Sequence, residues 1–273
     1  MLRCPHCHAP LDRAERTFRC PAGHSFDVAR QGYVALDPRP ARGDTAEMVA
    51  ARVAFLEAGH YAPIAEALVD AARGAAPRAA GRGDAGAAGR GGEGAARRDA
   101  ARVVVDVGAG TGYYLARLLE ALPGARGVAL DSSRPALRRA ARAHPAITAV
   151  ACDIWDALPI QDDAADLVIN VFAPRNAPEM RRVLAPGGTI LVVTPTERHL
   201  RELDLLAVHP NKRERIHAEL DEPVSTRTVE FELDLDADAV QTLVAMGPAA
   251  HHGRRAQGPA TVTASVVIEA FRG

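Results

Sequence analysis

The sequence predicts an α/β protein in which a small cysteine-bearing unit precedes a doubly wound, mostly parallel sheet. Three cysteines and three histidines lie within the first 24 residues, and from residue 103 onward apolar strand-like runs alternate with helical runs. Such alternation is typical of parallel sheets whose helices cover both faces. We expect a sheet of seven strands.

Length and composition fit a packed globular protein. The chain has 273 residues, of which 48% are hydrophobic and 25% are charged, and its formal net charge is -1. These values give no overall sign of an acidic or a basic partner. No apolar run approaches the ~20 residues of a membrane-spanning helix, and the N-terminus lacks the apolar core of a signal peptide. We therefore expect a cytoplasmic protein that makes no contact with a membrane.

Residues 1–38 contain the pattern C-x2-C-x12-C-x3-H. Two short knuckles about a dozen residues apart match the spacing of a tetrahedral zinc site. A segment this short cannot bury enough apolar surface to fold alone, so a structural metal would stabilise it. We expect the zinc ligands to be Cys4, Cys7, Cys20 and His24.

Two alternatives concern this unit. A redox C-x-x-C motif would need a following helix in a βαβ setting, and Pro5 and the second ligand pair argue against it. His6 or His8 could replace His24 as the fourth ligand. In either arrangement four ligands close the site, so the metal would be structural and not catalytic.

Residues 39–72 predict a helical connector, and residues 73–102 predict a flexible insertion. Asp44 and Glu47 suggest a capping box ahead of two apolar-striped helices that Gly59 separates. The stretch 73–102 is rich in glycine and has no aromatic and no large aliphatic residue. Such a composition cannot offset the entropy lost on ordering the chain.

Residues 103–273 form the predicted sheet domain. Five strands of parallel type are expected at 103–107, 127–131, 147–152, 166–173 and 189–194. Residues 229–236 and 261–271 alternate apolar and polar side chains on either side of a helix-like stretch. This alternation suggests an antiparallel pair that closes the sheet at one edge.

A glycine-rich loop, Gly108-Ala109-Gly110-Thr111-Gly112, follows the first strand of this domain. Glycines let the backbone approach a ligand, and the helix that follows offers free N–H groups. A G-x-G-x-G loop alone also fits dinucleotide-binding folds. Asp106 favours S-adenosylmethionine over NAD, because a carboxylate there would repel a pyrophosphate and attract the ammonium of an amino acid.

Two further acids follow the next two strands. Asp131 ends the second strand, where it could accept hydrogen bonds from ribose hydroxyls, and Asp153 follows the third, where it could bind the adenine amino group. Each acid alone fits equally well as a helix cap or a solvated strand end. Together with the glycine loop they favour S-adenosylmethionine as the cofactor.

Several motifs resemble those of a known family. They are C-P-x-C-x12-C-P-x-x-H-x-F-D-x-A-x-x-G-Y-V, G-D-T-A-E-M, A-G-H-Y, D-V-G-A-G-T-G-Y-Y, V-F-A-P-R and T-P-T-E-R-H-L. The combination spans nearly the whole chain. It is similar to the 23S rRNA (guanine-N1) methyltransferases of the RlmA type, a family that includes forms conferring macrolide resistance.

The resemblance implies a fold, a reaction and further site residues. A zinc-ribbon-like unit would help to hold a 23S rRNA hairpin, and a Rossmann-like class I S-adenosylmethionine-dependent methyltransferase domain would methylate N1 of a guanine in it. By motif, Tyr61, Gly112, Tyr113 and His199 match positions that contact the methyl donor. The insertion at 73–102 is longer than the family's spacer, which affects linker geometry and not chemistry.

The sequence singles out no general base. The candidates are Asp153, His199 and His60. Trp155 and Phe172 are expected in the core or in a pocket wall. Five arginines of the zinc unit are candidates for contacts with RNA phosphates: Arg3, Arg13, Arg16, Arg19 and Arg30.

Two other functions stay open at this point. A methyltransferase of small metabolites would use the zinc unit as a lid or a dimer contact, and a non-catalytic RNA-binding protein could keep the fold without the activity. The sequence does not determine which guanine is the target, whether the protein forms a homodimer, or whether its role is housekeeping or antibiotic self-resistance.

Overall fold

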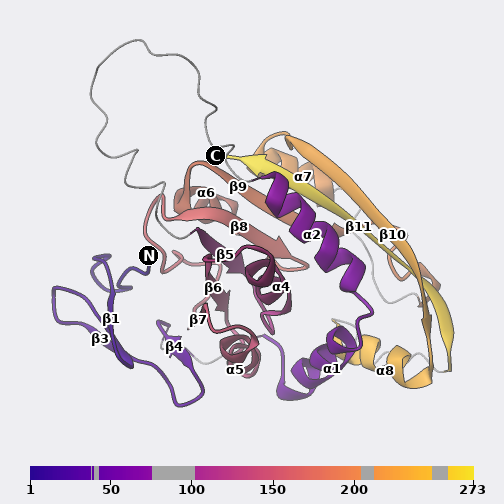
Figure 1. Cartoon of the computed structure of the whole chain (residues 1–273), viewed down its shortest axis with the longest axis horizontal. Helices are drawn as coiled ribbons and strands as arrows, with labels where there is room; N and C mark the ends of the chain where they lie inside the picture. The colour runs from indigo at the N-terminus through magenta and orange to yellow at the C-terminus, as the bar shows by residue number, and fades with distance from the viewer. Residues whose placement is uncertain (38, 40–42, 76–101, 204–211, 248–257) are drawn as a thin grey trace, which may run out of the picture.

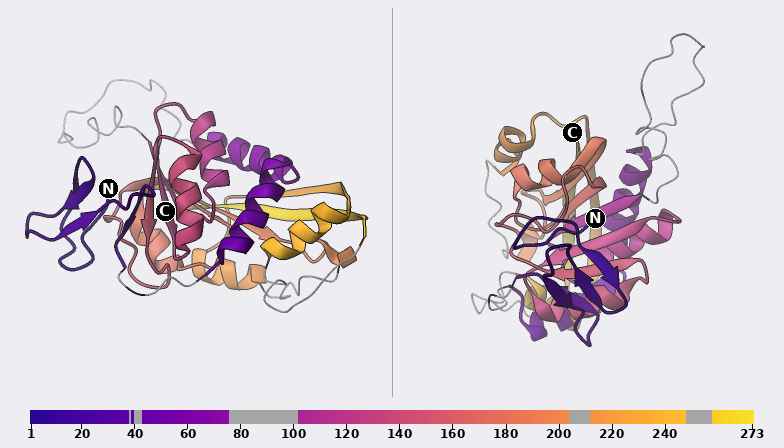
Figure 2. Two further views of the ribbon diagram at one scale, coloured as in Figure 1. Left: turned by 90° about the horizontal axis from the view of Figure 1, so that it is seen from below. Right: turned by 90° about the vertical axis from the view of Figure 1, so that its left-hand side faces the viewer.

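The chain folds into a small antiparallel ribbon joined to a large mixed sheet that carries helices on both faces (Figure 1). The computed structural model describes all residues except 38, 40–42, 76–101, 204–211 and 248–257. Most of the insertion predicted at 73–102 lies outside the described residues. Figure 2 shows that the ribbon stands at one end of the sheet domain and that the long C-terminal strands run to the other.

The N-terminal ribbon contributes one strand to the large sheet. Strands β1 (Asp12–Ala14), β2 (Thr17–Arg19) and β3 (Ser25–Asp27) pair with one another in an antiparallel ribbon. Strand β4 (Tyr33–Ala35) leaves this ribbon and pairs in parallel with β7 (Ile147–Ala151). The large sheet therefore has eight strands and not the seven predicted. The sequence suggests a short strand at residues 33–36 but does not assign it to the large sheet, because β4 has only three residues and lies in the cysteine-bearing segment.

The sheet order is β10-β11-β9-β8-β5-β6-β7-β4. Its remaining strands are β5 (Val103–Val107), β6 (Arg126–Asp131), β8 (Ala165–Val171), β9 (Leu184–Pro195), β10 (Ser225–Leu235) and β11 (Ala260–Arg272). Strands β4 to β9 are parallel, and the last two are antiparallel, so the predicted mostly parallel sheet with a closing antiparallel pair is confirmed. The order reverses between β5 and β8, where ligands bind at the carboxyl ends of such strands.

The helices follow the predicted alternation. They are α1 (Ala46–Glu57), α2 (Ala62–Gly74), α4 (Tyr113–Ala121), α5 (Arg134–Ala143), α6 (Ala177–Val183), α7 (Lys212–Leu220) and α8 (Ala237–Met246), with a short 3-10 turn at Arg201–Leu203. Gly59 separates α1 from α2 at φ +83°, as predicted. The predicted capping box is wrong, because Thr45 caps α1 by accepting from the Met48 N–H and Asp44 forms an ion pair with Arg52 instead.

Side chains of the central strands alternate between two apolar layers, because successive strand residues point to opposite faces. Val104 packs in the layer built with α1, α2, α4, α5 and α8, and Val105 packs in the layer built with α6, α7 and the ribbon. Leu2 of the ribbon is 1% exposed and forms a β-bridge with Ile160. The ribbon is therefore anchored in the second layer and does not hang from a linker.

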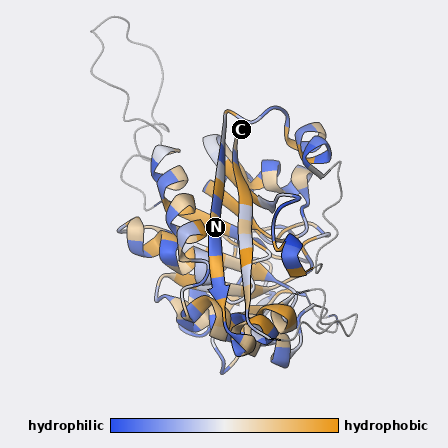
Figure 3. Cartoon of the chain, turned by 90° about the vertical axis from the view of Figure 1, so that its right-hand side faces the viewer, coloured by the Kyte–Doolittle hydropathy of each residue, from blue (hydrophilic) through white to orange (hydrophobic). Residues whose placement is uncertain are grey.

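Seen from the side of β10 and β11, the two long strands carry both hydrophilic and hydrophobic segments (Figure 3). No helix in the part of the chain that the structure describes is long and apolar enough to cross a membrane.

Candidate functional site

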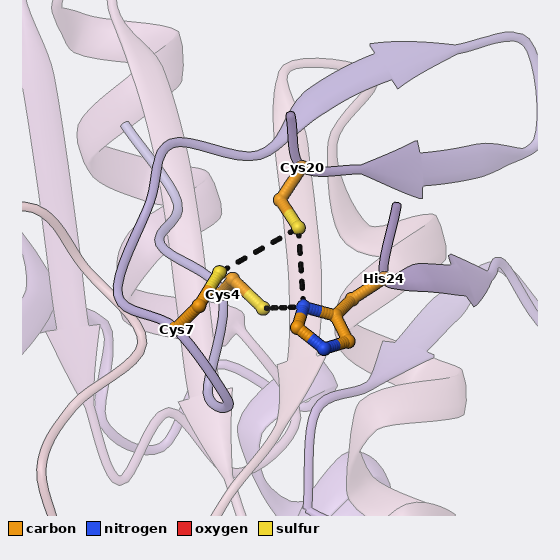
Figure 4. Close-up of side chains that lie close together, drawn as sticks. All are labelled: Cys4, Cys7, Cys20 and His24. Carbon is orange, nitrogen blue, oxygen red and sulfur yellow. Dashed lines mark hydrogen bonds between the residues drawn. The ribbon is translucent and has the colours of Figure 1, made fainter. Parts of the chain in front are cut away.

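The four predicted metal ligands converge in the ribbon (Figure 4). The ligand atoms of Cys4, Cys7, Cys20 and His24 all lie within 4.8 Å of one another. The Nδ1 atom of His24 lies 3.5 Å from the sulfur of Cys4 and 3.3 Å from that of Cys20, and the sulfurs of Cys7 and Cys20 are 3.6 Å apart. A zinc tetrahedron with bonds of about 2.0–2.3 Å has edges of roughly 3.5–3.8 Å, so the cluster fits zinc.

Two tight turns bring the ligands together. In the first, the His8 N–H donates to the Cys4 carbonyl over 2.9 Å, and in the second the Gly23 N–H donates to the Cys20 carbonyl over 2.9 Å. Gly23 has φ +88°, the left-handed conformation that favours glycine. His24 and not His6 or His8 completes the set among the described residues. Four protein ligands leave no open position, so the centre is structural.

The glycine loop lies at the carboxyl end of β5 and makes close backbone contacts. A Cβ atom at Gly108 would lie 2.4 Å from that of Ala173, and one at Gly112 would lie 2.9 Å from the Cα of Ala140. Both glycines have positive φ, at +80° and +75°. Larger residues would therefore push the loop away from its two neighbours.

Two acids flank this loop, of which Asp106 is buried and Asp131 is partly buried. Asp131 accepts from the Gly110 N–H and the Ser133 N–H, each over 2.7 Å. Burial raises the pKa of both Asp131 and Asp106, and their mutual repulsion raises that of Asp106 further. Asp106 is 2% exposed, and no described residue donates a hydrogen bond to its carboxylate. A cationic ligand would relieve this unfavourable arrangement.

Two more polar atoms at this edge of the sheet lack partners. The Tyr114 hydroxyl and the Asn170 Oδ1 atom are buried without a hydrogen bond to any described residue. Buried polar atoms are nearly always satisfied, so unpaired ones beside the glycine loop indicate a polar ligand. These groups fit S-adenosylmethionine, which carries an ammonium, a carboxylate and ribose hydroxyls.

Asn170 also ties two loops together. Its amide nitrogen donates to the Val107 carbonyl over 2.8 Å and to the Pro174 carbonyl over 2.9 Å. It thereby holds the loop after β8 against the end of β5. Sequence reasoning missed this residue, although an asparagine inside the apolar run DLVINVFA is the signal that could have revealed it.

An aromatic cluster adjoins the glycine loop. The Nε2 atom of His199 forms a hydrogen bond with the Tyr61 hydroxyl over 3.2 Å. Its Nδ1 atom accepts from the Ser265 N–H over 3.1 Å. The backbone contact places the ring proton on Nε2, so Tyr61 accepts from His199 and keeps its own proton to donate. Phe172 stacks on His199 with ring centroids 5.7 Å apart. Tyr61 and His199, far apart in sequence, are thus neighbours.

These contacts disfavour His199 as a general base. Its one lone pair is occupied by a backbone N–H, and burial lowers its pKa from 6.5 to about 4. His60 packs on Phe55 with ring centroids 4.6 Å apart, at the end of α1. Asp153 accepts from the Trp155 N–H over 3.0 Å and lies 3.9 Å from the Arg39 guanidinium.

Asp153 lies apart from the aromatic cluster, whereas Tyr113 is connected to it through Tyr114. Asp153 lines a cleft of about 340 Å³ between the ribbon and the end of β7, together with Arg3, His6, His8, Arg39 and Asp156. Tyr113 begins α4 and makes an edge contact with Tyr114. Trp155 and Phe172 are 64% and 38% exposed, so neither belongs to the core, and a place in a pocket wall stays a prediction.

We expect His199→Gln to flatten the dependence of stability on pH. In the unfolded chain His199 gains a proton below pH 6.5, whereas in the folded protein it stays neutral to about pH 4. The unfolding free energy of the wild type should therefore fall as the pH drops through this window, by about 3 kcal/mol from this residue. Urea unfolding at pH 4.5, 5.5 and 7 measures the difference, and parallel profiles for the two proteins would contradict it.

Comparison with known proteins agrees with this geometry. Residues 2–40 match the zinc ribbon described as RlmA, N-terminal, and residues 104–188 match a methyltransferase domain. A 23S rRNA (guanine(748)-N(1))-methyltransferase from Streptomyces fradiae is 50% identical over 260 residues, which cover 92% of this chain and 86% of that protein. The chain belongs to the 23S rRNA (guanine-N1) methyltransferase family.

Other relatives define the extent of the likeness. A protein from Micromonospora griseorubida with the provisional name 23S rRNA (guanine-N(1)-)-methyltransferase is 50% identical and covers 99% of this chain and 97% of its own length. A trans-aconitate 2-methyltransferase from Azoarcus is 38% identical but covers only 36% of this chain. As a member of the rRNA family, the protein combines a structural zinc ribbon with an S-adenosylmethionine-dependent methyltransferase fold.

Proposed function

We propose that this protein transfers a methyl group from S-adenosylmethionine to N1 of a guanine in a 23S rRNA hairpin, at the position named for the Streptomyces fradiae relative, guanine 748. The observation that carries the proposal is the 50% identity to that relative along nearly the whole chain, zinc ligands and glycine loop included. Relatives named for other substrates, malonyl-[acyl-carrier protein] and trans-aconitate, match only 37% and 36% of the chain, which disfavours the metabolite alternative.

The donor site proposed here uses the residues at the carboxyl ends of β5 and β6. Gly108, Gly110 and Gly112 allow close approach, Asp106 pairs with the ammonium, and Asp131 accepts from the ribose. S-adenosylmethionine supplies a methyl group that is already activated on a sulfonium. Tyr61, Tyr113 and His199 line the same site by family resemblance, and Asp153 faces the adenine. The hydrogen bond between Tyr61 and His199 supports these two residues, and the burial of Asp106 and the backbone contacts of Asp131 support the two acids.

Phe172 is proposed as the aromatic surface on which the target guanine stacks. Its φ of +53° is strained for a bulky residue, and such strain is retained mainly at functional sites. The ring is 38% exposed and backed by His199, Tyr61 and Tyr114. Ala173, the next residue, contacts the glycine loop. An aromatic face in this place can stack a base beside the donor.

The residues around this seat position the base, and none of them is assigned as the general base. Guanine N1 carries a proton that must leave before or during methyl transfer. The Tyr61 hydroxyl, held by His199, keeps a proton to donate to a base oxygen or to the donor. Positioning of this kind supplies much of the rate when the methyl group is already activated.

Primer extension tests the reaction. Ribosomal RNA from a host lacking this modification is incubated with the protein and S-adenosylmethionine, and N1-methylation is read as a reverse-transcriptase stop next to the target guanine. Mass mapping of the same fragment should show one added methyl group. Absence of transfer to any RNA would overturn the proposal, and failure to bind S-adenosylmethionine by calorimetry would favour the non-catalytic alternative.

Further consequences of the proposal concern the cell. Action on ribosomal RNA places the activity in the cytoplasm, and sedimentation equilibrium tests whether the protein forms a homodimer. We propose that the methyl group also protects the ribosome from a macrolide. Expression in a sensitive host should then raise the inhibitory concentration, whereas unchanged sensitivity with a methylated guanine would indicate a housekeeping role.

We expect Asp106→Asn to weaken donor binding about tenfold while stabilising the free protein. The raised pKa of Asp106 means that the folded state holds its proton more tightly than the unfolded chain. The stability of the free wild type should therefore fall as the pH rises through the raised pKa, and the asparagine variant should lack this loss. Calorimetry with S-adenosylmethionine and thermal melts from pH 4 to 8 measure both effects. A variant with a lower melting temperature than the wild type at pH 8 would contradict the inference that the buried charge of Asp106 destabilises the free protein.

A further inference from the structure

Helix α5 carries a dense stripe of positive charge. Arg138, Arg139 and Arg142 are exposed and Arg134 is partly exposed, and residues 132–145 contain no acid. No carboxylate among the described residues forms an ion pair with any of the four. Because the whole chain has a net charge of -1, this cluster is a local excess.

Two arginines of the ribbon, Arg3 and Arg16, form more contacts within the protein than the four arginines of α5 do. Arg3 donates to the Leu158 carbonyl and lies 3.6 Å from Asp162 and 3.7 Å from Glu179, with its side chain 13% exposed. Arg16 donates to the Val28 and Ala29 carbonyls. Arg3 therefore attaches the ribbon to the sheet domain, and these contacts disfavour the RNA contact expected from the sequence.

The α5 stripe continues into the ribbon. Gly32, in the turn before β4, packs so closely on α5 that a Cβ atom there would lie 3.0 Å from the Cβ of Ala141. The same turn carries Arg30, which is exposed and has no ion-pair partner among the described residues. Figure 1 shows α5 beside β4, at the junction of the ribbon and the sheet domain.

We propose that the α5 stripe, Arg134, Arg138, Arg139 and Arg142, binds the phosphate backbone of the RNA substrate and extends the ribbon's contact across the junction. The proposal rests on the proposed function. From Arg134 to Arg142 the helix rises about 12 Å, enough for two or three successive phosphates of one strand. The stripe starts next to Asp131, at the donor site, so RNA held there leads to the reaction site.

The stripe fits RNA better than a lipid surface. A helix that binds a membrane presents apolar side chains beside its charges. Three apolar residues of α5, Ala136, Leu137 and Ala140, are fully buried in the sheet domain, and its one exposed apolar side chain is the small Ala143. What remains exposed is a row of guanidinium groups, whose geometry suits phosphate oxygens.

Reversing two of these charges tests the proposal. The variant R138E/R142E should bind a 23S hairpin fragment roughly 10- to 100-fold more weakly than the wild type at 100 mM salt. The slope of log affinity against log salt should become shallower by about 1.5, because two phosphate contacts are lost. The affinity for S-adenosylmethionine should stay within twofold.

The variant R117E/R227E is the matched control, with the same charge change at two exposed arginines of α4 and β10. It should keep the wild-type salt slope. Equal slopes for the two double variants would overturn the proposal, as would stronger binding of the wild type to anionic vesicles than to RNA. Loss of methyl transfer by the wild type itself would instead overturn the proposed function, so the two failures are distinguishable.

Discussion

Replacing Cys4 and Cys7 by serine is expected to release the zinc ion and to lower methyl transfer to RNA by at least a thousandfold. A closed zinc centre contributes on the order of 10–16 kcal/mol to the folding of a small domain. The ribbon has no core of its own large enough to replace that contribution. Without zinc its two turns should open, and the RNA-holding surface should be lost.

The methyl donor should still bind to this variant, with an affinity within about threefold of the wild type. The glycine loop, Asp106 and Asp131 belong to the sheet domain, and the core layer built with α1, α2, α4, α5 and α8 contains none of the four metal ligands. Elemental analysis measures zinc, calorimetry measures donor binding, and primer extension measures transfer. The variant Cys152→Ala is the control, since this buried thiol lies outside the cluster. RNA transfer retained in a zinc-free variant would refute the role given to the ribbon.

Replacing Phe172 by leucine should lower kcat/KM for RNA roughly a hundredfold. Stacking of a base on an aromatic ring is worth about 1–3 kcal/mol, and leucine keeps the apolar volume but loses the flat face. Phe172→Tyr should restore most of the activity because it keeps the ring. Donor affinity should be unchanged in both variants, since the effect acts on the base.

A second exposed aromatic residue gives the control for this experiment. Trp155 is 64% exposed and follows β7, away from the aromatic cluster. Trp155→Leu should therefore leave kcat/KM for RNA within about threefold of the wild type. If Phe172→Leu has as little effect on kcat/KM for RNA as Trp155→Leu, or if it lowers donor affinity as much as it lowers kcat/KM for RNA, the guanine does not stack on Phe172.

Much of the fold could be predicted because its signals are local. The run VVVDV and its successors are apolar on both faces, which identifies strands of a covered parallel sheet. The spacing of Cys4, Cys7, Cys20 and His24 reflects two short turns, and the structure confirms that they form one cluster. The place of β4 as the eighth strand was not predicted, because three residues carry too little pattern to be assigned to a sheet more than a hundred residues away in the sequence.

The site was predictable only where a motif follows a strand. Asp106, Asp131 and the three glycines stand at strand ends, so topology alone places them together. Three other residues could be recognised only from their surroundings in the fold. Asn170 donates two hydrogen bonds to distant carbonyls, the buried Tyr114 hydroxyl has no partner among the described residues, and Phe172 has a strained backbone and an exposed ring. None of these properties can be inferred from the type of the residue alone.

By itself, the sequence determined the zinc ribbon, the alternating sheet domain and the glycine loop, because ligand spacing, strand periodicity and turn chemistry act over a few residues. Only the tertiary structure decided that β4 joins the ribbon to the sheet, that Arg3 attaches the ribbon while α5 leaves its arginines free, and that Tyr61 meets His199. These depend on which surfaces the folded chain buries against each other, and burial is a property of the whole packing and not of any short segment.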